Sequence, residues 1–422
     1  MRNRRVGGWA DRRIGWVATG MALLGSQVTA QTIAITGGTV YSVSGPRIER
    51  GTVVIAGGKI VAVGANVAVP AGATVIDASG KWVTPGLIHA NANAGGGVAG
   101  LFAYSEQSKQ GDINPSFNLA EGIDPAAITI PLARTGGVTT GVLTPNGSFL
   151  PGVAVAIDLA GDHPEDMIAR SPAALMLDMT DASKGAGGGA RAGTLARIRQ
   201  LFADAIEHDR RRLEFKRGAT QEFSASPAEL DALLPALRGA MPVFINANRR
   251  IDIANALKLA REYHLKLILG GAIEGWQVAA AIAAAKVPVV MEPNRDIPSF
   301  DGLGARLDNV TLLREAGVKV VIAQGDPGGE RSLRYAAGNA VRNGVSWDDA
   351  LKAITLWPAE AFGLGLYGSL DAGKVANVVI WSGDPFEFSS AAEKVFIRGR
   401  ETSLRTRENE LRDRYRTLPP AR

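Results

Sequence analysis

The chain has 422 residues, of which 46% are hydrophobic and 21% are charged, a balance typical of a globular protein with a large core. It has no cysteine, which excludes disulfides, thiolate metal sites and a cysteine nucleophile. The first 30 residues hold five arginines and one aspartate, so they carry four of the five net positive charges. The remaining chain is almost neutral and gives no indication of nucleic-acid binding.

Residues 1–30 have the pattern of an export signal. Arginines at 2, 4, 5, 12 and 13 precede an apolar stretch from Ile14 to Gly25, and SQVTA then offers small residues for cleavage. The apolar stretch is shorter than the roughly 20 residues that a membrane span needs. We therefore expect cleavage after Ala30 and a periplasmic or secreted protein that does not remain in the membrane. The choice between the Sec and twin-arginine routes stays open.

Short β segments lie at both ends of the remaining chain. TIAITGGTVYSV, GTVVIAGGKIVAVG and ATVIDASGKWV are rich in β-branched residues and end at turn residues. The same pattern returns in YGSLDAGKVANVVIW and KVFIRGR. We expect residues 31–84 and 363–402 to form one composite β-sandwich.

Apolar strands alternate with helices over residues 85–362. Strands are predicted in VTTGVLTP, PVFINA, LKLILGG, VPVVMEP and VKVVIAQGD, and helices over 252–264, 275–285 and 309–317. This alternation predicts an α/β fold with a parallel sheet, and closure into a (β/α)₈ TIM-type barrel is its simplest form. Residues 403–422 predict a charged, solvated helix or tail.

Polar residues follow several of these strands, where the active site of such a barrel forms. In PGLIHANANAG, Asn91 and Asn93 are two residues apart, and INANRR repeats the spacing with Asn246 and Asn248. Residues at this spacing point to one face of a strand. Another strand ends in AQGDPGG, which contains Asp326.

These segments resemble the amidohydrolase superfamily, in the composite-domain branch that includes imidazolonepropionase and related exported amidohydrolases. The likeness is carried by VIDASGKWVTPGLI before the first barrel strand, TGGVTTGVLTP at the second and AGVKVVIAQGD at the eighth. It is also carried by TLWPAEAFGL and GSLDAGKVANVVIWSGDP near the end of the chain. The resemblance covers almost the whole chain after residue 30. It implies hydrolysis of C–N bonds other than peptide bonds, as in cyclic amides, at a metal centre that is usually zinc.

The positions that the resemblance assigns to the metal depart from the family pattern. Where the family has histidines, this chain has Asn91 and Asn93 on the first strand, Asn246 on the fifth and Gly270 on the sixth. Met176 is our assignment for the fourth-strand lysine, and His89 takes the place of an aspartate. The eighth-strand aspartate is kept, as Asp326.

This substitution pattern argues against a metal cofactor. Zinc takes imidazole, thiolate or carboxylate ligands, usually three or more from the protein, whereas asparagine offers a neutral amide oxygen. Two asparagines and one aspartate would bind even Ca²⁺ poorly. A catalytic metal lowers the pKa of its bound water from about 15.7 to about 7. Asp326 alone, as a general base, would contribute only about 10²–10⁴-fold.

Three hypotheses remain. In the first, the chain binds a small polar molecule through the side chains of His89, Asn91, Asn93, Asn246 and Asn248, because amides both donate and accept hydrogen bonds. In the second, it is a non-catalytic partner of a metal-competent amidohydrolase, or a homo-oligomer. In the third, it is a hydrolase that uses Asp326, with His89 as a residual base. The plainer alternatives are a silent barrel mouth, a loop-capping Asp326 and a hydrogen-bonded His89 near the rim.

Overall fold

A computed structural model describes residues 31–92, 113–145, 147–212, 223–294, 297–325 and 329–416. The predicted export signal, Asn93 and Asp326 lie outside the described residues. From Gln31 onward the chain forms one compact unit that contains two sheets. None of the helices in the described part of the chain combines the length and hydropathy that a membrane crossing requires.

The first sheet combines strands from the two ends of the chain. Its strands are β1 (Ile33–Val40), β2 (Ile48–Ala56), β3 (Lys59–Gly64), β4 (Thr74–Asp77), β5 (Trp82–Pro85), β14 (Val378–Trp381), β15 (Ala392–Ile397) and β16 (Arg400–Thr402). Their order is β16-β15-β14-β5-β1-β2-β3, with β4 paired to β1. Because β14 pairs antiparallel with β5, the predicted composite of N- and C-terminal segments is confirmed.

The second sheet is the barrel. Its strands are β6 (Leu87–Ala92), β7 (Val138–Leu143), β8 (Gly152–Asp158), β9 (Ile168–Asp178), β10 (Val243–Ala247), β11 (Leu267–Gly271), β12 (Val289–Met291) and β13 (Val320–Ile322). These strands pair in sequence order, and the last, β13, comes back into contact with β6. The sheet is therefore a nearly closed eight-stranded barrel, and the predicted fold class is confirmed.

Strand β8 differs from the all-parallel expectation. It runs antiparallel to both β7 and β9, whereas the other neighbouring strands of the barrel are parallel. The connection from β7 to β8 covers only residues 144–151. A parallel crossover needs about a dozen residues or more, so a connection of this length joins antiparallel strands.

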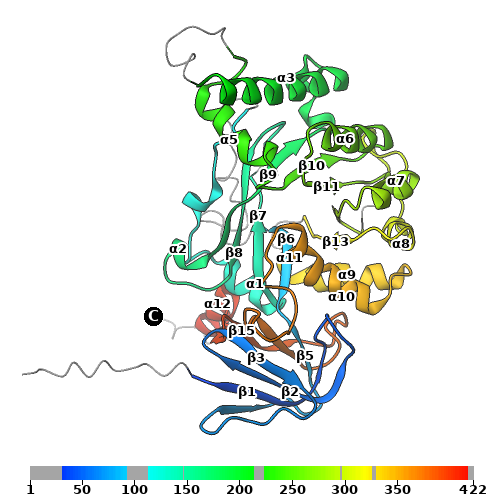
Figure 1. The fold of residues 1–422 in the computed structure, drawn as a ribbon. Coiled ribbons are helices and arrows are strands. Elements are labelled where there is room, and N and C mark those ends of the chain that lie inside the picture. Colours follow the sequence, from blue (N-terminus) through cyan, green and yellow to red (C-terminus); the bar gives the residue numbers. More distant parts are fainter. Residues whose placement is uncertain are drawn as a thin grey trace, which may run out of the picture. The chain divides into compact units, whose positions relative to one another are not determined.

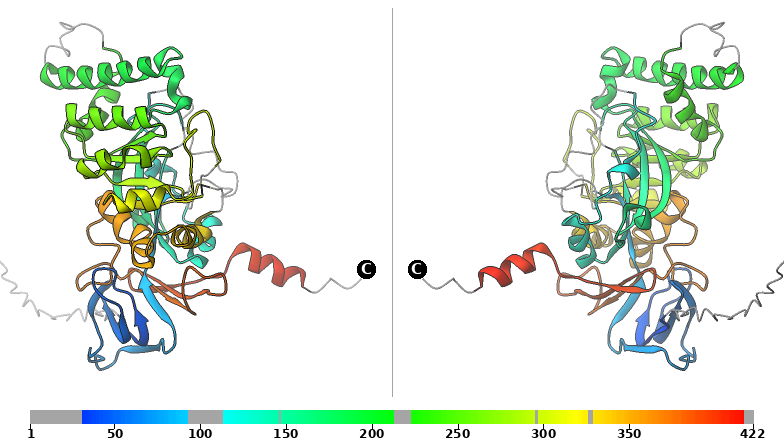
Figure 2. Two further views of the ribbon diagram at one scale, coloured as in Figure 1. Left: turned by 90° about the vertical axis from the view of Figure 1, so that its right-hand side faces the viewer. Right: turned by 90° about the vertical axis from the view of Figure 1, so that its left-hand side faces the viewer.

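Helices cover the outside of the barrel, as Figure 1 shows for α6 to α10. The helices are η2 (Leu119–Gly122), α1 (Thr129–Thr135), α2 (Pro164–Met167), η3 (Asp181–Gly187), α3 (Arg191–Arg210), α5 (Pro227–Leu237), α6 (Arg250–Glu262), η4 (Gly275–Val278), α7 (Ala279–Ala284), α8 (Asn309–Glu315), η5 (Gly329–Ser332), α9 (Leu333–Arg342), α10 (Trp347–Ala353), α11 (Leu356–Ala361) and α12 (Arg407–Tyr415). The predicted helices coincide with α6, η4 with α7, and α8. Helix α12 has no buried residue, and Figure 2 shows it standing clear of the barrel helices.

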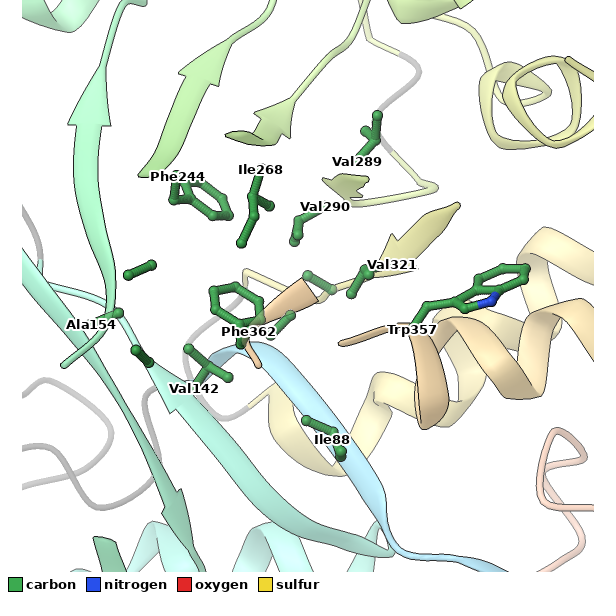
Figure 3. Packing of buried hydrophobic residues seen from close by; sticks show 14 of the residues in the cluster. Ile88, Val142, Ala154, Phe244, Ile268, Val289, Val290, Val321, Trp357 and Phe362 are labelled. Atoms are coloured by element: carbon green, nitrogen blue, oxygen red, sulfur yellow. The ribbon is translucent and has the colours of Figure 1, made fainter. Parts of the chain in front are cut away.

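The interior of the barrel is a packed apolar core. Inward side chains come from all around the sheet, among them Ile88, Val142, Phe244, Ile268 and Val290 (Figure 3). Phe362, which follows α11, is fully buried and stacks on Phe244 with ring centroids 6.3 Å apart. The core therefore fills the barrel up to Phe244, and the space beyond Phe244 lies toward the carboxyl ends of the strands.

A buried polar cluster joins the barrel to the composite sheet. Asp158, at the end of β8, is completely buried. Its carboxylate accepts hydrogen bonds from Thr140 Oγ1 at 2.9 Å, Tyr367 Oη at 2.9 Å, Asn377 Nδ2 at 2.9 Å and Arg398 Nε at 2.6 Å. Since Asn377 and Arg398 belong to the C-terminal segment, one carboxylate ties that segment to the barrel wall.

Candidate functional site

Two adjoining cavities lie at the carboxyl ends of the barrel strands. Their volumes are about 220 and 260 Å³, and both are lined by Asn91, Phe244 and Asn246. The first extends toward β11, β12 and β13 and reaches Asn248 and Glu292. The second extends toward β7 and β9; besides the shared residues, its lining includes Thr144, Pro151, Met176 and Asp178. We refer to the two cavities together as the barrel mouth.

Three of the asparagines singled out in the sequence meet in this mouth. Asn91 Oδ1 accepts a hydrogen bond from Thr144 Oγ1 at 2.5 Å. Asn246 lies beside Asp178 in the register of β9 and β10 and hydrogen-bonds to its carboxylate. Asn248 Nδ2 donates to Asp301 Oδ2 at 2.9 Å. The structure thus brings residues of β6 and β10 to one cavity wall.

The sequence predicted that His89 contacts a ligand, but the structure places its side chain away from the mouth. Its side chain is completely buried, and it lines neither cavity. The Asn91 backbone N–H donates to His89 Nδ1 at 3.2 Å. Burial lowers the pKa of His89 to about 4, against a smaller opposing effect from the Gln324 backbone, so the ring is neutral at pH 7. His89 is therefore a neutral, buried residue outside both cavities.

Two carboxylates of the mouth were not assigned from the sequence. Asp178 ends β9, and its Oδ1 accepts hydrogen bonds from the Thr180 backbone N–H at 2.7 Å and from Thr180 Oγ1 at 2.6 Å. Burial, and to a lesser extent the charge of Asp301, raises the pKa of Asp178, while the hydrogen bonds from Thr180 and Asn246 oppose the rise. Glu292 follows β12 directly. Their position in the sequence could have identified them, because each carboxylate is the last residue of an apolar strand segment, AALMLD or VPVVME.

Arg191 organises the rim of the mouth. It begins α3 and forms salt bridges to Asp181 at 3.1 Å, to Asp301 at 2.6 Å and to Asp252 on α6. Asp252 is almost fully buried, and burial is the main reason that its pKa is raised. Through Asp301, the same cluster fixes the loop that follows β12 against Asn248. One guanidinium thus holds three carboxylates from different elements together.

Replacing Arg191 with methionine is expected to loosen this rim. The change keeps the length of the side chain but leaves Asp252 and Asp301 without their shared cation, so we expect a loss of about 2 kcal/mol in the free energy of unfolding. Limited proteolysis should also cleave the 297–307 loop faster. The control is Arg199→Met, which removes another arginine of α3 and breaks its salt bridge with Glu262 on α6. Equal loss of stability and equal cleavage in both variants would contradict the role given to Arg191.

The side chains of β10 fill the space in front of β11. A Cβ atom at Gly270 would lie 2.2 Å from Cε1 of Phe244 and 2.3 Å from Oδ1 of Asn246. At Gly271, where φ is +76°, a Cβ atom would lie 2.2 Å from Oδ1 of Asn248. The sixth barrel strand, β11, therefore presents no side chain to the mouth at Gly270 and Gly271. Phe244 and Asn246 occupy the volume that a side chain at Gly270 would need.

The donor set at the positions that the family resemblance assigns to the metal does not fit zinc. Asn91 and Asn246 offer amide oxygens, Met176 offers a thioether and Gly270 offers no side chain. Among the described residues, no group of three or more His, Cys, Asp or Glu side chains is arranged to hold a metal ion. Asn93 and Asp326 belong to the same set and lie outside the described residues.

Comparison with known proteins identifies the family. A model of the amidohydrolase family matches residues 276–402. The crystal structure of an amidohydrolase from Thermotoga maritima MSB8 superposes with a TM-score of 0.80 at 27% identity, over 88% of this chain and 100% of that one. This chain belongs to the amidohydrolase superfamily. Its composite sheet places it in the composite-domain branch.

Curated amidohydrolase relatives match over most of this chain. The imidazolonepropionase of Acidiphilium cryptum (strain JF-5) is 27% identical over 375 residues, which cover 81% of this chain and 89% of that protein. The amidohydrolase tasK of Hapsidospora irregularis is 24% identical over 376 residues, but the match spans only 37% of its length. A prolidase structure with a TM-score of 0.56 at 18% identity shares the fold alone.

Proposed function

We propose that this superfamily member binds a small polar molecule at the barrel mouth and does not carry out efficient zinc-assisted hydrolysis. The superfamily activity is hydrolysis of C–N bonds, and the scaffold for it is present. The observation that carries the proposal is the filled space at Gly270, where Phe244 and Asn246 occupy the volume into which a sixth-strand ligand would project.

The mouth has the composition of a binding site for a polar ligand. Asn91, Asn246 and Asn248 each offer both donors and acceptors, and Thr144 and Thr180 add hydroxyls. Phe244 provides an apolar floor common to both cavities. Polar groups that converge on an apolar floor fix the orientation of a small molecule without any chemical step.

Export is part of the same proposal. We propose that the chain is cleaved after Ala30 and acts in the periplasm or outside the cell, where it meets its ligand as a homo-oligomer or beside a metal-competent amidohydrolase. The signal-like pattern of residues 1–30 supports this location. The partner arrangement predicts a neighbouring gene for an amidohydrolase with intact His-x-His, and co-purification of its product.

Metal analysis tests the proposal directly. Protein purified with added zinc and then dialysed is expected to hold far less than one zinc per chain, because amide oxygens are weak zinc ligands. Elemental analysis by mass spectrometry gives the stoichiometry. Lactams, imidazolones and N-acyl amino acids should show no turnover above background, with Asp326→Asn as the control. Stoichiometric, tightly held zinc, or turnover that Asp326→Asn abolishes, would overturn the proposal in favour of a working hydrolase.

A further inference from the structure

Among the described residues, the charged groups that line the barrel mouth are carboxylates. Asp178 and Glu292 both line it, whereas none of the described lining residues is Lys, Arg or His. Asp178 ends β9 and Glu292 directly follows β12, so the two carboxylates approach the shared space around Asn246 from different parts of the sheet. A ligand that lies in this space has negative groups toward each of the two cavities.

The described charges at the rim of the mouth balance one another. Arg191 at the rim is already shared by Asp181, Asp252 and Asp301. Two further cations act on this cluster: Arg249 is attracted to Asp252, and Lys184 forms a salt bridge of 2.8 Å with Asp181. Three carboxylates therefore face three cations at the described rim, so the charge that favours a cationic ligand is that of the carboxylates lining the mouth itself.

Asp178 in particular lacks a cationic partner within the described residues. Its hydrogen-bond partners are neutral, namely Thr180 and Asn246. A carboxylate away from water is costly unless it is paired with a positive charge. A cationic ligand would supply that charge, and its N–H groups would find acceptors in the carboxylate and amide oxygens of the wall.

We infer that the ligand of the barrel mouth carries a positively charged nitrogen group with several N–H donors, such as an amidinium or a guanidinium. This inference rests on the proposed function and adds the ligand class. Phe244 lines both cavities, and aromatic side chains attract guanidinium groups.

The test uses three ligands of one shape and different charge: benzamidinium, benzamide and benzoate. Isothermal titration of the full chain is expected to show benzamidinium binding at least about tenfold more tightly than benzamide, because hydrogen bonds between charged groups are the stronger class. Benzoate should bind most weakly. Asp178→Asn and Glu292→Gln should each reduce benzamidinium affinity by about tenfold and change benzamide affinity little. Glu165→Gln, at an exposed carboxylate on α2, is the matched control and should change neither.

The outcomes separate this inference from the proposed function. If benzamide or benzoate binds as tightly as benzamidinium, the ligand class is wrong, while a polar binding site remains. If none of the three binds, both proposals fail. Circular dichroism of each variant checks folding. Should Asp178→Asn unfold, Glu292→Gln carries the charge test.

Discussion

Asp158→Asn is expected to lower the free energy of unfolding by about 3 kcal/mol, as found when one partner of a buried charge pair is removed. Asp158 has no exposed surface and accepts hydrogen bonds from Thr140, Tyr367, Asn377 and Arg398. An asparagine amide would keep the shape, but it would turn two N–H groups toward donors and leave Arg398 without its anion. Urea unfolding followed by circular dichroism measures the loss.

The position of Asp158 explains why the effect should be large. Burial, followed by the nearby charge of Asp158, raises the pKa of Tyr367, so that tyrosine stays a neutral donor to the carboxylate. The remaining partners hold the C-terminal segment against β7 and β8. Asp158 therefore stabilises the joint between the barrel and the composite sheet as well as a single strand.

A surface pair provides the control for Asp158. Lys394 and Glu401 form a salt bridge of 2.6 Å between β15 and β16, and both side chains are substantially exposed. Glu401→Gln should cost less than about 1 kcal/mol, because water screens exposed pairs. A loss in Glu401→Gln equal to that in Asp158→Asn would show that burial of the Asp158 network is not what stabilises the joint.

The fold was predictable from local patterns because those patterns record burial. Strand runs such as PVFINA and LKLILGG face the core on one side and helices on the other, so they read as continuous apolar segments. The direction of β8 was not predictable in the same way. An apolar run looks alike in either direction, and the short connection at 144–151 was the one signal for an antiparallel strand.

The site was predictable where strand ends and family positions coincide. Asn91 and Asn246 fall at both, Asn248 follows a strand end, and the three meet in the mouth. Asp178 and Glu292 also lie at strand ends. They do not occupy any position that the family resemblance assigns to the metal, and for this reason they were not predicted as site residues. Burial of His89 depends on packing against neighbouring strands, which residue spacing along one strand does not reveal.

Gly270→Ala is expected to lower the free energy of unfolding by about 2 kcal/mol, because an added atom in a filled core forces its neighbours to move. The new methyl would lie 2.2 Å from Phe244 and 2.3 Å from Asn246. Phe244 is stacked on the buried Phe362 and has little freedom to yield. Gly185→Ala, where an added Cβ meets nothing within 4 Å, is the control and should be nearly neutral. Urea unfolding of the two variants measures the difference.

A double mutant identifies the atoms responsible and bears on the metal. Phe244→Leu removes the ring atoms that crowd Gly270, so Gly270→Ala should lower the free energy of unfolding less in that background than in the wild type.

By the same reasoning, histidines placed at 91, 93, 246 and 270 should not yield zinc binding while Phe244 remains, since its ring occupies the space that the imidazole at 270 needs. Zinc stoichiometry of this variant with and without Phe244→Ala decides the matter. Full zinc loading with Phe244 intact would mean that the ring does not bar a sixth-strand ligand, and that replacement of the ligands alone accounts for the altered site.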